Sequence, residues 1–134
     1  MKNTVSGLSH IALIVKDIEQ MISFYQEFTE MQVTHKRTDE EVKVVWLRLP
    51  DPQSLTIVMI ENPSLNTQSY QRMNHFGFDA VSREAVNKIA QKAQKMGVLK
   101  YPATDGGIIL GYFCMITDPD GNQLEFAYGQ MREN

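Results

Sequence analysis

The chain has 134 residues, of which 43% are hydrophobic and 22% charged, and its formal net charge is −3. This composition excludes a disordered chain, and its slight acidity gives no reason to expect nucleic acid or an anionic membrane as a partner. The single cysteine, Cys114, excludes an internal disulfide and suits a reducing compartment. Its place in an apolar strand predicts a buried, inert thiol. The apolar run "HIALIV" is too short for a signal peptide or a membrane span, so we expect a cytoplasmic protein.

The first half of the chain predicts one strand, one helix and three further strands. Asp17 is placed to cap the helix, and apolar residues recur at helical spacing from Ile18 to Phe28. The charged "TDEE" and the "PDPQ" segment predict turns between the later strands. The expected strands cover residues 8–15, 31–38, 43–49 and 54–61.

The second half predicts the same order of elements. After a strand led by His75, Ser82 is placed to cap a helix that Gly97 ends, and Met96 is expected in the core, as is Met31 in the first half. The segment "TDGG" (104–107) predicts a flexible loop, and "GQMREN" (129–134) a frayed tail. The expected later strands cover residues 98–102, 110–117 and 122–128.

The two halves are copies of one unit. Residues 10–33 align with 75–98 without a gap, so that His10 meets His75. Further along, Asp51-Pro52 meets Asp118-Pro119, and Val58 meets Glu125. We therefore expect an α+β fold of two βαβββ repeats within a single domain, residues 1–134. Module 1 covers about 8–61 and module 2 about 74–128.

Alternation along the strands places three chemically active side chains on the faces opposite the helices. His10, His75 and Glu125 each occupy such a position, among small or apolar neighbours. Two imidazoles and one carboxylate form a facial triad that holds a divalent first-row metal and leaves coordination positions open. The alternative is that each is a lone polar residue at a strand end. The equivalence of His10 and His75 in the repeat favours the metal site.

The sequence resembles the vicinal oxygen chelate superfamily, also called the glyoxalase, bleomycin-resistance and dioxygenase superfamily. The resemblance rests on "HIALIVKDIEQMISFY" (10–25), "HFGFDAVS" (75–82) and "YFCMITDPDGNQLEF" (112–126). It implies that the two modules form a cup-shaped mixed sheet and that His10, His75 and Glu125 fall on the family's metal-ligand positions. The cofactor so implied is one divalent ion (Fe²⁺, Mn²⁺, Ni²⁺ or Zn²⁺), and the family commonly forms homodimers.

Val58 stands where glyoxalase I enzymes, by the resemblance, place a fourth, glutamate ligand. An isopropyl group neither binds a metal nor moves a proton, so true glyoxalase I activity is disfavoured. Extradiol dioxygenases of the family carry a tyrosine where this chain has Met115. Fosfomycin-resistance transferases carry a hydroxyl residue where it has Ala12. The predicted ligands are thus present without the accessory residues of any one branch.

Four further residues are predicted to line the cup and bind substrate. Trp46 and Arg48 share one face of a strand, and the repeat aligns them with Phe113 and Met115. Arg48 is placed either to bind a substrate carboxylate or enolate or to extend into solvent along Trp46. The other polar candidates fall outside this group: Asp79 is expected at the rim or behind a ligand histidine and His35 in solvent, while Tyr128 is expected in the core.

These observations predict a metal-dependent enzyme, dioxygenase-like or lyase-like, that acts on a small oxygen-rich molecule. The alternative is a metal-free module of the bleomycin-resistance type that binds or sequesters a small molecule. A third possibility is a structural partner domain in a larger assembly. No nucleic acid or membrane is expected as a partner.

Overall fold

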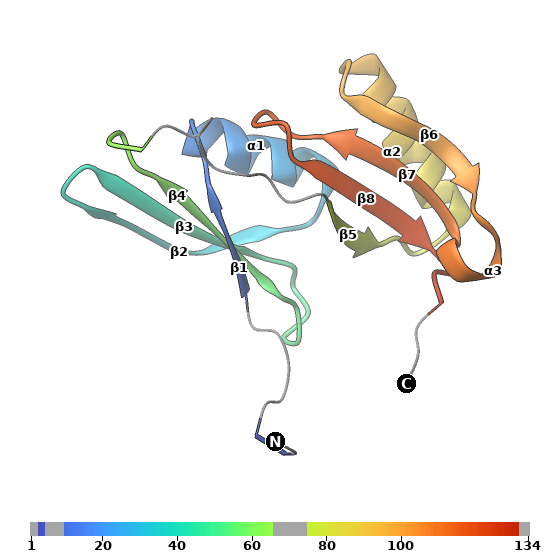
Figure 1. The fold of residues 1–134 in the computed structure, drawn as a ribbon, viewed down its shortest axis with the longest axis horizontal. Coiled ribbons are helices and arrows are strands. Elements are labelled where there is room, and N and C mark those ends of the chain that lie inside the picture. Colours follow the sequence, from blue (N-terminus) through green and yellow to red (C-terminus); the bar gives the residue numbers. More distant parts are fainter. Residues whose placement is uncertain (1–2, 5–9, 66–74, 132–134) are drawn as a thin grey trace. The chain divides into compact units, whose positions relative to one another are not determined.

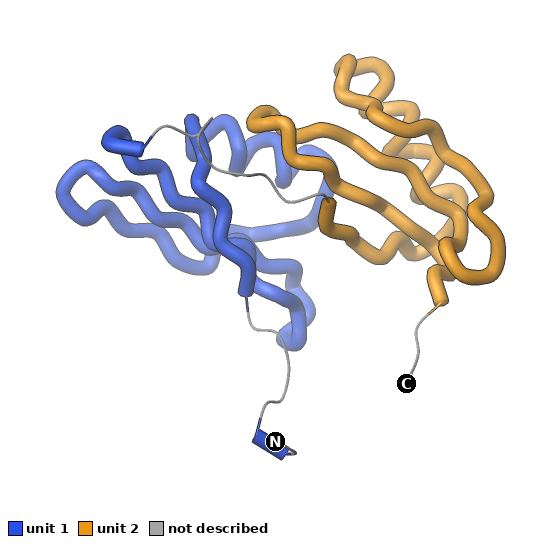
Figure 2. Tube along the Cα trace, viewed as in Figure 1, with its two compact units in different colours: residues 1–70 blue, residues 71–134 orange. Residues whose placement is uncertain are grey.

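The computed structural model describes residues 3–4, 10–65 and 75–131 (Figure 1). The chain divides into two compact units, residues 1–70 and 71–134 (Figure 2). Each predicted module lies within one of these units, and each unit has its own sheet and helix. We describe the two units separately.

Unit 1 is a four-stranded mixed sheet with one helix. The parallel pairing of β1 with β4 joins the first and last elements of the unit, and the other neighbours pair antiparallel, so the strand order is β1-β4-β3-β2. The elements are β1 (His10–Ile14), α1 (Ile18–Phe28), β2 (Gln32–Asp39), β3 (Val42–Arg48) and β4 (Thr56–Glu61).

Unit 2 repeats this topology, with strand order β5-β8-β7-β6 and a parallel β5–β8 pair. It adds one short helix, α3, between β6 and β7. The elements are β5 (Phe76–Asp79), α2 (Arg83–Lys95), β6 (Leu99–Asp105), α3 (Gly107–Leu110), β7 (Tyr112–Thr117) and β8 (Gln123–Tyr128). The predicted fold class, α+β with two βαβββ repeats, is confirmed.

The two long helices begin at the predicted caps. The Asp17 carboxylate accepts from the backbone N–H of Gln20, and the Ser82 hydroxyl accepts from that of Ala85. Both bonds satisfy N–H groups that a helix leaves without an internal partner. At the end of α2, Gly97 has φ +73°, the left-handed conformation that favours glycine.

Alternation along the strands separates a helix-covered face from an open face in each sheet. In unit 2, α2 packs across β6, β7 and β8. Alternate residues of β7 and β8 are fully buried on this side, and the apolar face of α2 meets them. These buried residues are Val86, Ala90, Ala93, Cys114, Ile116, Leu124 and Phe126. The intervening residues lie on the open face, which is the face that carries the predicted site.

The repeated Asp-Pro turns are built around their aspartates. Asp118 is buried, and its carboxylate accepts from the N–H groups of Asp120 and Asn122 at 2.9 and 2.8 Å and from the Asn122 side chain at 2.9 Å. Asp51, in the exposed copy, accepts from the N–H of Gln53 at 2.9 Å. The buried turn fixes the start of β8 and hence the position of Glu125 along it.

Four predictions for unit 2 need correction. Residues 104–107 are not a flexible loop: β6 continues to Asp105, whose carboxylate accepts from the N–H of Gly107, and α3 follows. The Met131 N–H donates to the Ile109 carbonyl at 3.0 Å, so residues 129–131 are bonded to α3, while 132–134 lie outside the described residues. Met96 and Tyr128, predicted in the core, are 44% and 43% exposed because each stands at the end of its element.

Met31, 3% exposed, is in the core as predicted. In the described part of the chain, every helix is too short or too polar to cross a lipid bilayer.

Candidate metal and substrate site

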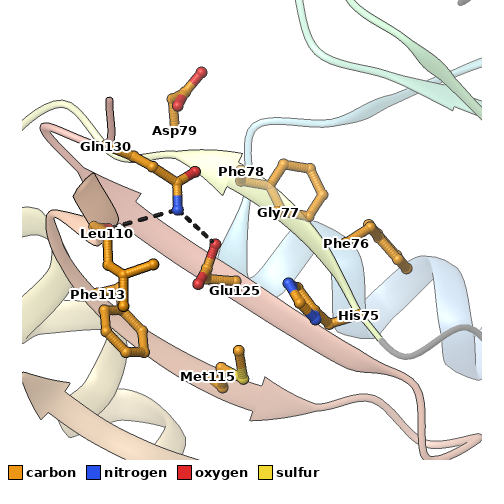
Figure 3. A pocket seen from close by; sticks show the side chains of 10 residues that line it. All are labelled: His75, Phe76, Gly77, Phe78, Asp79, Leu110, Phe113, Met115, Glu125 and Gln130. Atoms are coloured by element: carbon orange, nitrogen blue, oxygen red, sulfur yellow. Dashed lines mark hydrogen bonds between the residues drawn. The ribbon is translucent and has the colours of Figure 1, made fainter. Parts of the chain in front are cut away.

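The open face of unit 2 contains a cavity of about 510 Å³ that includes two of the three predicted ligands (Figure 3). β8 lies between β5 and β7, and cross-strand pairing places Glu125 opposite both Gly77 and Met115. Residues paired in this way share a face, so these three strands present Gly77, Glu125 and Met115 to one space. The residues lining the cavity are His75, Phe76, Gly77, Phe78, Asp79, Leu110, Phe113, Met115, Glu125 and Gln130.

Glu125 is a buried carboxylate, 8% exposed, at the centre of this face. Its Oε2 accepts from the Gln130 side-chain amide at 3.3 Å. Gly77, directly opposite, leaves room for the carboxylate: a Cβ there would lie 3.3 Å from Oε2. Burying a carboxylate costs free energy unless hydrogen bonds, an ion pair or a bound cation compensate its charge, and one amide hydrogen bond compensates it only in part. The site therefore suits a positively charged occupant.

His75 precedes β5 and has an exposed side chain. Figure 3 shows its imidazole on the same side of the sheet as the Glu125 carboxylate, one strand away. An imidazole nitrogen and a carboxylate oxygen are both good ligands for divalent first-row metals. The structure thus brings His75 and Glu125 to one cavity, as the alternation predicts.

Apolar side chains form part of the walls around this pair. Phe113 and Met115 line the cavity, as predicted, and Leu110 of α3 lies on the same side as Phe113 (Figure 3). Tyr101 stacks behind Phe113, with ring centroids 5.7 Å apart and planes 9° from parallel. Asp79 also lines the cavity and is exposed. Figure 3 shows Asp79 beyond Gln130, away from His75, which agrees better with the predicted rim position than with a place behind the imidazole.

The third predicted ligand, His10, belongs to unit 1 and is the first residue of β1. In the part of the chain that the structure describes, there is no group of three or more histidine, cysteine, aspartate or glutamate side chains close enough to hold a metal. Unit 2 by itself therefore supplies two of the proposed ligands. His10 remains a prediction from the repeat.

The open face of unit 1 shows how the two copies differ. Ala12 pairs with Val58 as Gly77 pairs with Glu125, which confirms that Val58 and Glu125 are equivalent. Glu61 is on the helix side, where its Oε2 accepts from the Ile18 N–H at 2.8 Å. It therefore caps α1 and does not replace the missing carboxylate.

The predicted equivalence of Trp46 with Phe113 is wrong: the strand pairing shifts it by two residues. Trp46 pairs with Val58, whereas Met115 pairs with Glu125, so Trp46 is equivalent to Met115. By the same register Arg48 is equivalent to Thr117. The connection from β3 to β4 is longer than that from β7 to β8, which shifts the alignment of these strands.

Trp46 and Arg48 lie on the face opposite the helix, as predicted, but with different surroundings. Trp46 is 40% exposed, and the His35 ring packs against it at a tilt of 48°, with ring centroids 4.6 Å apart. The Arg48 Nη2 donates to the carbonyls of Pro52 and Ser54 at 2.7 and 2.9 Å. These bonds tie the Arg48 guanidinium to the turn before β4, where backbone carbonyls already occupy its Nη2. Contact between Arg48 and substrate stays a prediction.

Cys114 lies on the helix side of β7 and is fully buried. Burial, assisted by the negative charge of Glu125, raises the pKa of the thiol to about 11. A thiol that stays protonated at neutral pH is a poor nucleophile. The prediction of a buried thiol is confirmed, and its inertness stays a prediction.

Gln130 and Leu110 are among the contributors to the cavity that sequence reasoning missed, as are Phe76 and Phe78. Gln130 falls in the segment predicted to be a frayed tail, and Leu110 at the edge of a predicted strand. The glycines around "GGIIL" signal a turn, but no local pattern shows that this turn meets the chain after β8.

Comparisons with known proteins agree with the fold. The family model of the glyoxalase/bleomycin resistance protein/dioxygenase superfamily matches residues 7–126. An uncharacterized protein of Pseudomonas aeruginosa, PA2024, is 36% identical over 127 residues, which cover 92% of this chain and 89% of that protein. The fosfomycin resistance protein FosX of Listeria monocytogenes is 30% identical over 129 residues, covering 96% and 94%.

One similar solved structure is a glutamate-to-glutamine mutant of Listeria monocytogenes FosX in complex with Mn(II) and 1S,2S-dihydroxypropylphosphonic acid. It has 26% sequence identity to this chain and a TM-score of 0.73, and the match covers 96% of this chain and 95% of that one. The family model spans nearly the whole sequence, and both βαβββ units have the expected topology. The chain belongs to the glyoxalase/bleomycin resistance protein/dioxygenase superfamily.

Proposed function

We propose that the protein is a metal-dependent enzyme that binds one divalent ion through His10, His75 and Glu125. The observation that carries this proposal is that His75, directly before β5, and the buried Glu125 carboxylate of the neighbouring strand β8 line one cavity. The donor set, one imidazole and one carboxylate from unit 2 with a second imidazole from unit 1, suits Fe²⁺, Mn²⁺, Ni²⁺ or Zn²⁺. The Mn(II) in the FosX complex supports a divalent ion at such a site.

The substrate we propose is a small molecule whose neighbouring oxygens bind the metal. A metal so placed would stabilise negative charge that develops on such oxygens or, if it is iron, bind O₂. Phe113, Met115 and Leu110 would pack against the apolar part of the substrate and keep water from it. Trp46 and Arg48 are proposed to contribute from unit 1. Val58, equivalent to Glu125, argues against an additional carboxylate ligand and against glyoxalase I chemistry.

The protein is further proposed to act as a homodimer, as the family resemblance implies. Size-exclusion chromatography with light scattering measures this directly. A mass of about one chain at micromolar concentration would contradict it.

The metal proposal is tested by titrating metal-stripped protein with Mn²⁺ and Zn²⁺. The sequence contains three histidines, which provide a matched set of variants. We expect His10→Ala, His75→Ala and Glu125→Ala each to weaken binding at least tenfold, and His35→Ala to bind like the wild type. His35 packs against Trp46 and is not a proposed ligand. Equal binding by all four variants would contradict the proposal.

The apolar residues in the cavity lining favour one alternative, a metal-free binding protein of the bleomycin-resistance type. In that case the cavity would bind an apolar ligand through residues such as Phe113 and Met115. Such a protein would retain ligand affinity in the His75→Ala variant and after treatment with a chelator. A metal-dependent enzyme would lose affinity in both.

A further inference from the structure

Gln130 stands two residues beyond the end of β8, yet its side chain reaches back to Glu125. Its Nε2 donates to the Glu125 Oε2 at 3.3 Å and to the Leu110 carbonyl at 3.5 Å (Figure 3). The amide therefore bridges the buried carboxylate and the end of α3.

The backbone around Gln130 is held in place by α3. The Met131 N–H donates to the Ile109 carbonyl at 3.0 Å. Gly111, which follows α3, has φ +71°, and a Cβ there would lie 2.5 Å from the Tyr128 carbonyl oxygen and 2.7 Å from the Gln130 nitrogen. Only glycine allows this close approach. The turn after α3 and the segment after β8 thus form one packed unit that fixes the origin of the Gln130 side chain.

The two oxygens of the Glu125 carboxylate are not equivalent in this arrangement. Oε2 accepts from Gln130. No described residue donates a hydrogen bond to Oε1. Oε1 is nevertheless not enclosed by protein. Among the described residues, the one side-chain polar atom that is enclosed without a hydrogen bond is the Nε of Arg48. Oε1 retains access to the cavity that Glu125 lines.

We infer that Gln130 is a positioning residue for Glu125: its amide holds Oε2 and thereby presents Oε1 to the metal. This inference rests on the proposed function. Groups that hydrogen-bond to metal ligands fix their orientation, and their loss costs about 10–100-fold in metal affinity. Because Gln130 is held by α3, the short helix acquires a role in metal binding through this amide.

The test is the affinity of metal-stripped protein for Mn²⁺, followed by the EPR signal of the free ion. Gln130→Met retains the length and the unbranched shape of the side chain and removes the donor. We expect about tenfold weaker binding, with the melting temperature of the metal-free protein little changed. Gln94→Met, an exposed position on α2, is the matched control and should bind like the wild type.

A double-mutant cycle separates positioning from a general structural effect. In a Glu125→Ala background, Gln130→Met should cause no further loss of Mn²⁺ affinity, because the group it orients is absent. An equal further loss there would overturn the inference, as would a Gln130→Met single variant that binds Mn²⁺ like the wild type. Wild-type protein that binds neither Mn²⁺ nor Zn²⁺ would overturn the proposed function and the inference together.

Discussion

Substituting Gly77 by alanine perturbs the proposed metal ligand by a single methyl group. The new Cβ would lie 3.3 Å from the Glu125 Oε2 and 3.7 Å from both the Glu125 Cβ and its carbonyl oxygen. The first contact is tighter than ordinary van der Waals packing, so the carboxylate must move by a few tenths of an ångström. Functional groups of a site must be held to within about 0.5 Å of their working positions, so we expect Mn²⁺ affinity to fall about threefold to tenfold.

The same substitution should have little effect on stability. Gly77 does not have a positive φ, so alanine can adopt its backbone conformation. Replacing glycine at such a position stabilises a protein by about 0.4–1 kcal/mol through the unfolded state, and the tight contact offsets part of this gain. The free energy of unfolding, measured with urea, should thus change by less than about 1 kcal/mol.

Gly97→Ala should show the opposite pattern, lower stability with unchanged Mn²⁺ affinity. Gly97 has φ +73°, and a Cβ there would meet no atom within 4 Å, so alanine costs about 1–2 kcal/mol of stability through backbone strain alone. Its Mn²⁺ affinity should equal that of the wild type. If Gly77→Ala bound Mn²⁺ as tightly as the wild type, the position of the Glu125 carboxylate would not determine metal binding, and the reasoning would be refuted.

Three further results are expected. The pKa of the Cys114 thiol is raised from 9.0 to about 11, so native protein should resist alkylation at pH 8. Above pH 9 the unfolded chain loses this proton while the folded chain keeps it, so the free energy of unfolding should fall between about pH 9 and 11, by up to about 3 kcal/mol. Urea titrations of Cys114→Ala should not show this fall. Asp118→Ala should lower the free energy of unfolding, measured with urea, by about 2–4 kcal/mol, because it leaves buried donors unpaired. Asp51→Ala, in the exposed copy of the turn, should lower it by less than about 1 kcal/mol. Equal losses would contradict this interpretation of the turns. Glu61→Gln should destabilise the protein by about 1 kcal/mol, because it weakens the cap of α1, without changing Mn²⁺ affinity; a changed affinity would show that Glu61 acts at the metal.

Much of the fold follows from local signals in the sequence. The caps at Asp17 and Ser82, the helical spacing of apolar residues and the alternation in the strands depend on residues close together in the chain. Alternation also predicts that His75 and Glu125 share a face, because β5, which follows His75, and β8 pair as strands with one covered side. The repeat adds the equivalence of Val58 and Glu125, which the pairing confirms.

The errors arise where position depends on contacts between distant segments. An ungapped alignment misplaces the register of Trp46, because the connections after β3 and β7 differ in length. The local sequence around Gln130 predicts a frayed tail, since its partners, Glu125 and Leu110, are defined by tertiary packing. Met96 and Tyr128 match the apolar pattern of their elements but extend past the end of the surface that covers them.

The central claim is that His75 and Glu125, with His10, bind a divalent metal. Metal content of gently purified protein, measured by mass spectrometry, tests it most directly, with His10→Ala, His75→Ala and His35→Ala purified in parallel. We expect about one Fe, Mn, Ni or Zn ion per chain in the wild type and in His35→Ala, and almost none in the other two. Wild-type protein that is empty as purified and stays empty after anaerobic reconstitution would contradict the claim.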